Sequence, residues 1–258
     1  PSDRVWIRMI ENLVRLEKTE ETSREISKFT EKNGMDTRLA LLRGLNALGT
    51  NNLKVAEESF ETAVRLDPDN AQAYLYRARM RLMSGDERLS DAARADLEKA
   101  VSLDGSLISA YEMLVDWHLN QNPQNISEAV SALKSLIDLK PENVSYKLRL
   151  ANLFLVRENF NQLDGLLQSA IKTNPELPIW YRLRAQMYLQ QKKEKEALAD
   201  LRRVYKMNPS SESLAPLAQL LIKQKSYSEA LELYRSCPDK EEIDKSGPLT
   251  ALQASALA

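Results

Sequence analysis

Apolar residues recur along the chain at helical spacing, in short runs that polar residues separate. Between residues 37 and 68 there are two such stripes, namely Leu42, Leu45 and Leu48, then Val55, Phe60, Ala63 and Val64. Spacings of three and four residues place each stripe on one face of a helix, and the polar stretch 49–52 separates the two. Pro68 ends the second helix because proline lacks an amide hydrogen and disfavours helical angles in its predecessor. The segment therefore predicts two amphipathic helices joined by a short turn.

Prolines that follow a short polar or charged stretch give the period of this pattern. Pro68, Pro141, Pro175 and Pro209 lie 73, 34 and 34 residues apart. The first interval is about twice the others, and Gly105 stands midway in it, after a sequence (VSLD) similar to the VRLD that precedes Pro68. Periods of 20–50 residues are typical of proteins in which each repeat packs on its neighbours. The sequence therefore predicts a repeat of about 34 residues.

We number the positions of each repeat from 1 to 34 (slots), so that the helix-ending proline, or Gly105 in its place, falls in slot 32. This frame divides the chain into seven repeats, and each is expected to be a helix pair. The repeats begin at Asp3, Thr37, Ala71, Ile108, Val144, Pro178 and Ser211, and the seventh ends near Asp244. The extra residues of the third and fourth repeats fall within 84–90 and 120–126, in the turn between the helices, where added length costs little. Asp36, Asn70 and Asn143 stand where a side chain would accept a hydrogen bond from the first free amides of a helix. We expect one array over residues 3–244.

Side-chain size repeats with the same period. Slots 8, 20 and 27 hold small residues. Slot 8 holds Gly44, Ala78, Ala151, Ala185 and Ala218, and slot 20 holds Ala56, Ala93, Ala129, Ala197 and Ala230. Slot 27 holds Ala63, Ala100 and Ala170. Slots 4 and 24 hold large residues. Slot 4 holds Trp6, Tyr74, Tyr111 and Tyr181, and slot 24 holds Ile26, Phe60, Leu97, Leu133, Leu167, Leu201 and Tyr234. Where two helices cross, a small residue lets the backbones approach and a large neighbour fills the remaining space.

This arrangement resembles that of the tetratricopeptide repeat (TPR) family, and the segments KVAEESFETAVRLDPDNAQAY (54–74) and KEALADLRRVYKMNP (195–209) fit its pattern closely. The resemblance covers residues 3–244 and implies an all-α fold, a right-handed superhelical solenoid of about seven antiparallel helix pairs. Four bulkier residues depart from the small slots: Ile10 and Thr22 in the first repeat, Val115 in the fourth and Leu163 in the fifth. We expect the first repeat to pack atypically, as terminal repeats often do.

The net charge of the chain distinguishes the TPR family from another repeat family with a similar repeat length. Pentatricopeptide arrays bind single-stranded RNA, and a protein that binds a polyanion is expected to be basic. This chain has 36 basic and 37 acidic residues among 258, a net charge of −1. We therefore expect no nucleic-acid partner. No apolar run approaches the length of about 18 residues that a membrane helix needs, so we expect no direct membrane insertion, and the sequence leaves the compartment open.

The residue types that carry catalysis and bind metals are scarce. The chain holds one cysteine, Cys237, and one histidine, His118, which excludes an internal disulfide and a Cys/His zinc cluster. His118 falls in a slot that later repeats fill with aromatic residues, and Cys237 falls in slot 27, so we interpret both as packed side chains. Trp117 and Trp180 are interpreted as packing on the previous repeat. No phosphate-binding loop or hydrolase motif occurs, and we expect no cofactor, no metal and no enzyme activity.

The family pattern implies that the first helix of each repeat lines the inner wall of the superhelix, with slots 2, 5 and 9 on that wall; these are the wall residues. The candidate peptide-binding residues among them are Arg38, Leu41, Leu45, Gln72, Leu75, Arg79, Glu112, Asp116, Leu148, Asn152, Arg182 and Gln186. The second and third repeats offer leucines edged by arginines and the fourth is acidic, which suits an extended peptide or a helix with apolar anchors and mixed charge. These slots lack the Lys-then-Asn order of the carboxylate clamp with which some TPR domains hold chaperone C-termini, so that partner is disfavoured.

Two functions follow from these observations. The first is a non-enzymatic scaffold that binds a peptide or partner protein through the superhelix, in its concave groove or, alternatively, on its convex face or edges. The second is the targeting or regulatory arm of a larger enzyme whose catalytic domain is not in this chain. Residues 245–258 are expected to form a capping helix or the truncated first helix of a further repeat. Neither the identity of the partner nor the oligomeric state follows from the sequence.

Overall fold

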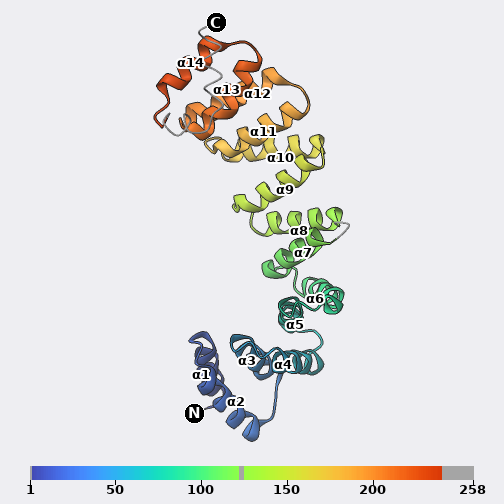
Figure 1. The fold of residues 1–258 in the computed structure, drawn as a ribbon. Coiled ribbons are helices and arrows are strands. Elements are labelled where there is room, and N and C mark those ends of the chain that lie inside the picture. The colour runs from blue at the N-terminus through green and yellow to red at the C-terminus, as the bar shows by residue number, and fades with distance from the viewer. Residues whose placement is uncertain (1, 122–124, 240–258) are drawn as a thin grey trace. The chain divides into compact units, whose positions relative to one another are not determined.

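The computed structural model describes residues 2–121 and 125–239, and helices account for most of this part of the chain (Figure 1). These ranges contain fourteen α-helices, one 3₁₀-helix and no β-strand. The expected all-α fold is therefore confirmed. The helix expected over 245–258 lies outside the described residues.

The helices fall into two compact units, residues 1–142 and 143–258. The first unit holds α1 (Asp3–Arg15), α2 (Thr19–Asn33), α3 (Thr37–Gly49), α4 (Leu53–Leu66), α5 (Ala71–Met83), the 3₁₀-helix η1 (Glu87–Leu89), α6 (Ser90–Leu103), α7 (Ile108–Asn120) and α8 (Ile126–Leu139). The second holds α9 (Val144–Val156), α10 (Phe160–Thr173), α11 (Pro178–Gln190), α12 (Glu194–Met207), α13 (Ser211–Lys223) and α14 (Tyr227–Ser236). The odd-numbered helices begin at the seven residues from which the 34-slot frame counts its repeats.

Within each unit, every helix packs mainly on the helices next to it in the sequence. Some first helices of successive repeats also touch, because α3 packs on α1 and α5, and α11 packs on α9. A chain in which each pair of helices contacts only its neighbours is a helical repeat solenoid. The first helices α1, α3 and α5 of the first unit therefore lie side by side, and so do α9 and α11 of the second.

The repeating size pattern forms the core. All seven residues of slot 24, from Ile26 to Tyr234, are buried. The bulkier residues Ile10, Thr22, Val115 and Leu163 in the small slots are buried completely, like the alanines that they replace. Because a fully buried leucine or phenylalanine stabilises the fold by roughly 1.5–3 kcal/mol, these slots supply much of the stability of each helix pair.

The turn inside six of the seven repeats contains one left-handed residue, in slot 15. The six described residues in this slot have φ between 53° and 67°, and they are Glu17, Asn51, Gly85, Glu158, Lys192 and Lys225. Residues other than glycine cost about 1–2 kcal/mol in this conformation. Four of the six are Glu or Lys, so the packing of the two helices holds the turn rather than the residue type within it.

Side-chain caps fix where several of the first helices begin. The side chains of Asp36, Asn70 and Asn143 each accept a hydrogen bond from an amide in the first turn of α3, α5 and α9, at 2.7 to 3.1 Å. The three expected N-caps are therefore confirmed. Such a cap contributes about 1 kcal/mol to helix stability.

Candidate functional site

The first unit carries eight of the twelve candidate peptide-binding residues, on α3, α5 and α7. Their exposure differs: Arg38, Gln72, Arg79 and Asp116 are exposed, Leu41, Leu45 and Glu112 are half-buried, and Leu75 is buried. Since α3 packs on α5, the wall residues of these two helices lie on neighbouring elements. The accessible part of this wall is therefore mostly polar.

The apolar strip expected on this wall belongs in part to the core. Leu41 and Leu45 pack against a buried cluster that includes Phe60 and Met80. Leu75 keeps only 6% of its surface exposed. Contact with a partner through these leucines is therefore limited to the half-exposed flanks of Leu41 and Leu45.

In the second unit the surface opens into a hollow between α11, α12 and α13, which we call the α11–α13 hollow. Its volume is about 270 Å³, near the lower end of ligand pockets, and suits one side chain of a peptide. Apolar and charged groups line it together: Ile179, Leu201, Val204 and Pro216, with Arg182 and Glu212. Three of these six, Ile179, Arg182 and Glu212, are wall residues. The other candidate residues of this unit are half-buried (Leu148) or exposed (Asn152 and Gln186).

Pro216 lies inside α13, where its ring nitrogen cannot donate a hydrogen bond. The helical acceptor four residues earlier is the carbonyl of Glu212, which therefore lacks its usual helical donor. Glu212 and Pro216 both line the α11–α13 hollow. The hollow thus combines apolar side chains with two opposite charges.

Two of the candidate arginines are paired across successive first helices. Arg182 of α11 donates to Glu212 of α13 at 2.6 Å, and the Nε of Arg38 on α3 donates to Glu11 of α1 at 2.7 Å. Both pairs remain accessible to solvent. Exposed pairs of this kind contribute about 1 kcal/mol or less to stability, so they are available for exchange with a charged partner.

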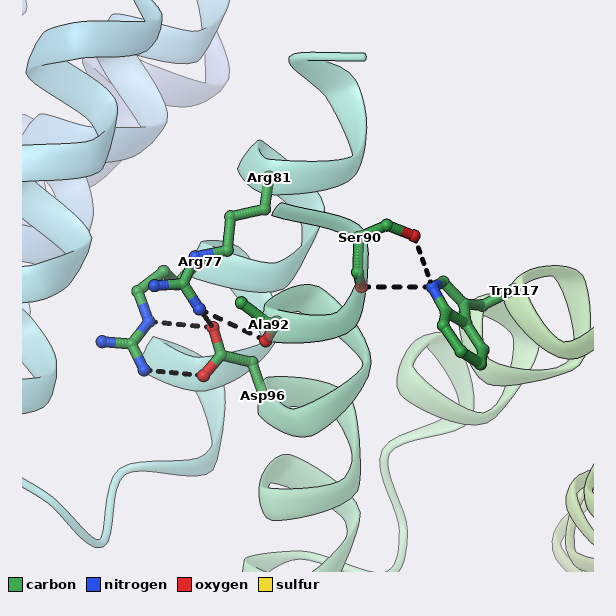
Figure 2. A network of polar contacts seen from close by, with 6 residues as sticks. All are labelled: Arg77, Arg81, Ser90, Ala92, Asp96 and Trp117. Carbon is green, nitrogen blue, oxygen red and sulfur yellow. Dashed lines mark hydrogen bonds and ion pairs between the residues drawn. The ribbon is translucent and has the colours of Figure 1, made fainter. Parts of the chain in front are cut away.

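Buried arginine–aspartate pairs are the main feature that the sequence did not predict. Asp96 of α6 is 5% exposed and accepts two hydrogen bonds from Arg77, at 2.6 and 2.8 Å, and one from Arg81 at 2.6 Å (Figure 2). In the sixth repeat Arg184 and Asp200 form the same two-bond pair at 2.7 Å. Hydrogen bonding to these carboxylates raises the pKa of the Arg77 and Arg184 guanidinium groups. These pairs lock the two helices of a repeat together.

A second set of hydrogen bonds joins successive repeats, and its donors are side chains in slot 10. The indole Nε1 of Trp117 donates to the carbonyl and the hydroxyl of Ser90, at 3.1 and 2.8 Å (Figure 2). Trp117 therefore packs on the second helix of the previous repeat, as predicted. Asn46 makes the equivalent bond to the carbonyl of Thr19 at 3.1 Å. In both cases the acceptor lies 27 residues earlier, at the first residue of a second helix.

The single histidine and the single cysteine of the chain are buried. His118 is 6% and Cys237 is 4% exposed. Burial lowers the pKa of His118 and raises the pKa of the Cys237 thiol, so both stay neutral at pH 7. Within residues 2–121 and 125–239, His, Cys, Asp and Glu do not gather in groups of three or more that could hold a metal ion.

None of the helices in the described ranges has the length and apolar character needed to cross a membrane.

Comparison with known proteins agrees with the geometry of the repeats. The family model described as "tetratricopeptide repeat" matches residues 41–107 and 165–212. The sequence has no match among curated proteins.

Solved structures of similar fold cover most of the chain. The C-terminal part of a TPR repeat-containing protein from Cytophaga hutchinsonii superposes with a TM-score of 0.68 at 14% identity, over 92% of this chain and 98% of that one. A structure of Naa15/Naa10 bound to HypK-THB gives 0.69 at 14% identity and covers 98% of this chain, which spans 39% of the length of its counterpart. YrrB, a TPR protein with an unusual peptide-binding site, gives 0.51 at 21% identity, over 78% of this chain and all of the other.

The repeat length, the buried small and large slots, the matched segments and the similar folds agree with one another. Residues 41–107 and 165–212 thus match the tetratricopeptide repeat family, and the described residues have the helical repeat fold of solved TPR proteins.

Proposed function

We propose that this chain is a protein-interaction scaffold that binds a peptide segment of a partner protein on the wall formed by the first helices of its repeats. TPR repeats support the general role of a scaffold, and the location of the bound peptide is the further step. The observation that carries this step is the α11–α13 hollow, because three wall residues line it beside apolar side chains.

The chemistry of the hollow suits an extended peptide. An apolar side chain of the partner would fill the space beside Ile179 and Pro216. The pair of Arg182 with Glu212 would exchange for charges on the peptide. The pocket for one apolar side chain and the charges beside it would give such a site its specificity.

The exposed polar residues of the same wall extend this surface beyond the hollow. Gln186 on α11 and Asn152 on α9 are exposed, and α9 packs on α11. Amide groups at these positions are suited to hydrogen bonds with peptide carbonyls.

A charge swap at the hollow tests the proposal. Dodecapeptides selected from a random phage-displayed library on the full chain would be labelled with fluorescein, and their affinity measured by fluorescence polarisation. We expect Arg182→Glu/Glu212→Arg, and separately Ile179→Asp, to weaken the selected peptides at least tenfold.

The second unit offers a matched control. Arg202 of α12 and Glu229 of α14 form another exposed pair at 2.8 Å, on second helices and away from the wall. The swap Arg202→Glu/Glu229→Arg should change affinity less than twofold. Equal losses from both swaps, or selected peptides that bind all variants alike, would refute binding at the wall.

The alternative of a targeting arm for a larger enzyme uses the same surface for the same kind of partner. The swap at Arg182 and Glu212 therefore tests the binding surface under either function.

A further inference from the structure

A second hollow lies in the first unit, between α2, α3 and α4, and we call it the α2–α4 hollow. Its volume is about 290 Å³, which suits a single side chain. Most of its lining is polar, and the residues that matter for binding are Arg43, Ser23, Asn46 and Asn52, with Ile26 and Val55 beside them. Among the described residues that line this hollow, Arg43 carries the only charge.

The α2–α4 hollow lies on the face of α3 opposite the wall. Successive residues of an α-helix are about 100° apart around its axis, because one turn takes about 3.6 residues. Slots 7, 10 and 14 of α3, which hold Arg43, Asn46 and Thr50, therefore point away from the wall residues in slots 2, 5 and 9. The second helices α2 and α4 lie on either side, since α3 packs on both. A partner in this hollow would leave the wall free.

Three arginines of the chain stand in slot 7, and two of them bind a carboxylate of their own repeat. Arg77 makes two hydrogen bonds to Asp96, at 2.6 and 2.8 Å (Figure 2). Arg184 makes two to Asp200, both at 2.7 Å. A planar guanidinium and a carboxylate match each other in this two-bond geometry. The third arginine of slot 7 is Arg43, so it stands at a position that this chain twice uses to hold a carboxylate.

Arg43 has no such partner in its own repeat. Slot 23 of the second repeat holds Ser59 in place of aspartate, and the Ser59 hydroxyl donates to the carbonyl of Val55 at 2.6 Å. Arg43 forms neither an ion pair nor a side-chain hydrogen bond within the part of the chain that the structure describes. It is exposed, whereas Arg77 and Arg184 are half-buried. Its guanidinium is therefore accessible to a carboxylate from another molecule.

Two neutral donors line the hollow together with Arg43. The side-chain amide of Asn46 donates to the hydroxyl oxygen of Ser23 at 2.9 Å, which leaves the Ser23 hydroxyl hydrogen for a ligand. The side-chain oxygen of Asn52 accepts from the amide of Val55 at 3.2 Å, so the amide hydrogens of Asn52 can face a ligand. One cation and two neutral donors, with no carboxylate among the described lining residues, favour an anion.

We propose that the α2–α4 hollow binds an aspartate or glutamate side chain from an acidic segment of a partner protein. The carboxylate would pair with Arg43 in the geometry that Asp96 and Asp200 have with their arginines, and the methylene groups would lie on Ile26 and Val55. The inference goes beyond the proposed function, because this surface faces away from the wall and takes a different segment of a partner.

The test compares two defined peptides on the full chain by fluorescence polarisation. The probe is a fluorescein-labelled dodecapeptide of Gly and Ser with a central Leu-Glu-Asp-Leu. The reference has Leu-Gln-Asn-Leu instead, which has nearly the same shape without the charge. We expect the acidic probe to bind at least tenfold more tightly than the reference. We also expect the Nε–H resonance of Arg43 to shift on titration with the acidic probe in ¹H–¹⁵N spectra.

Substitutions in slots 7 and 23 separate the hollow from general attraction. Arg43→Gln removes the cation and should weaken the acidic probe at least fivefold. Ser59→Asp supplies the aspartate that slot 23 has in the third and sixth repeats. Because this aspartate would bind Arg43 within the chain, the variant should also weaken the probe at least fivefold.

Each substitution has a matched control. Arg65→Gln removes the same charge from an exposed position on α4, and Ser59→Ala removes the same hydroxyl without adding a carboxylate. Both controls should change the affinity for the acidic probe less than twofold. Circular dichroism shows whether each variant folds. If the buried Ser59→Asp substitution unfolds the chain, Arg43→Gln decides the outcome, since Arg43 is exposed.

Equal weakening by Arg43→Gln and Arg65→Gln, equal binding of the acidic probe and the neutral reference, or an Arg43 resonance that does not move would overturn the inference. So would tighter binding of a probe with two phosphoserines in place of the acidic residues, because phosphate would then be the ligand. The swap Arg182→Glu/Glu212→Arg should leave binding of the acidic probe unchanged. If that swap weakens the library-selected peptides while Arg43→Gln has no effect on the probe, the proposed function stands and the α2–α4 hollow does not. If the reverse holds, the α2–α4 hollow stands alone.

Discussion

The helix pairs α3/α4 and α9/α10 have residues of different size at the point where their two helices cross. In α3/α4 the small slots hold Gly44 and Ala56, and the two helices approach each other closely along their length. In α9/α10, Leu163 occupies the second small slot, and the helices approach each other less closely. Leu163 is nevertheless completely buried. A larger residue at the crossing point is thus accommodated without exposing the core of the pair.

The comparison teaches that a helix pair forms whether this slot holds a small residue or a large one. At position 44 even alanine does not fit without movement, because a Cβ atom on Gly44 would lie 2.4 Å from the ring of Phe60. Phe60 is the large residue of slot 24 and is fully buried. Two helices that differ in separation can still continue one array, since each contacts only its neighbours.

Removing the side chain of Leu163 should have the largest effect. If Leu163 holds α9 and α10 apart, Leu163→Ala leaves a cavity and should lower the free energy of unfolding by about 2–5 kcal/mol. Urea denaturation followed by circular dichroism measures this loss. Leu166→Ala, at a half-buried position three residues on, is the control and should cost about 1 kcal/mol. Equal costs at the two positions would contradict the role given to Leu163.

Adding one methyl group to α3 should have an intermediate effect. Gly44→Ala forces the Phe60 ring to move at a cost of about 1–3 kcal/mol, while the gain in helix propensity returns about 1 kcal/mol. We expect a net loss of about 1–2 kcal/mol in the same denaturation experiment.

Gly165, in α10, is the matched control for Gly44. A Cβ atom on Gly165 meets nothing within 4 Å, so Gly165→Ala should stabilise the chain by about 0.5–1 kcal/mol. Opposite signs for the two glycines are the expected result. A gain at both positions would mean that α3 and α4 separate freely.

The turns of the two pairs should show the smallest effect. Slot 15 holds Asn51 in α3/α4 and Glu158 in α9/α10, with φ of 56° and 53°. Asparagine tolerates this left-handed conformation better than glutamate does. Glu158→Asn should therefore raise, and Asn51→Glu should lower, the free energy of unfolding by about 0.5 kcal/mol each. Shifts of the same sign would show that the packing, and not the turn residue, decides both.

Much of this architecture could be predicted from spacing alone. Residue size in slots 8, 20 and 24 marks the positions where helices cross, so the pattern identified buried residues such as Ala78, Ala129 and Leu97. N-caps such as Asn70 could be placed because their chemistry is local. Both signals depend on residues whose partners stand at fixed offsets within one period.

The polar contacts could not be predicted in the same way. Arg77 and Asp96 are 19 residues apart, whereas their counterparts Arg184 and Asp200 are 16 apart, because of the extra residues in the turn of the third repeat. An arginine in slot 7 with an aspartate in slot 23 is the signal that would have revealed these pairs.

The wall was harder to predict than the core. The pairing of Arg38 with Glu11 depends on how successive repeats are rotated, which one period of sequence does not encode. The burial of Leu75 depends in the same way on the neighbouring helices.

Site-specific photo-crosslinking tests the central claim most directly. A photoreactive phenylalanine derivative at Gln186, Gln72 or Arg79, all exposed on first helices, would be compared with the same group at Glu58 or Arg202 on second helices. With a library-selected peptide bound to the full chain, the account predicts crosslinks from positions on the first helices and little or none from the second helices. Crosslinks that arise mainly from Glu58 and Arg202 would contradict it.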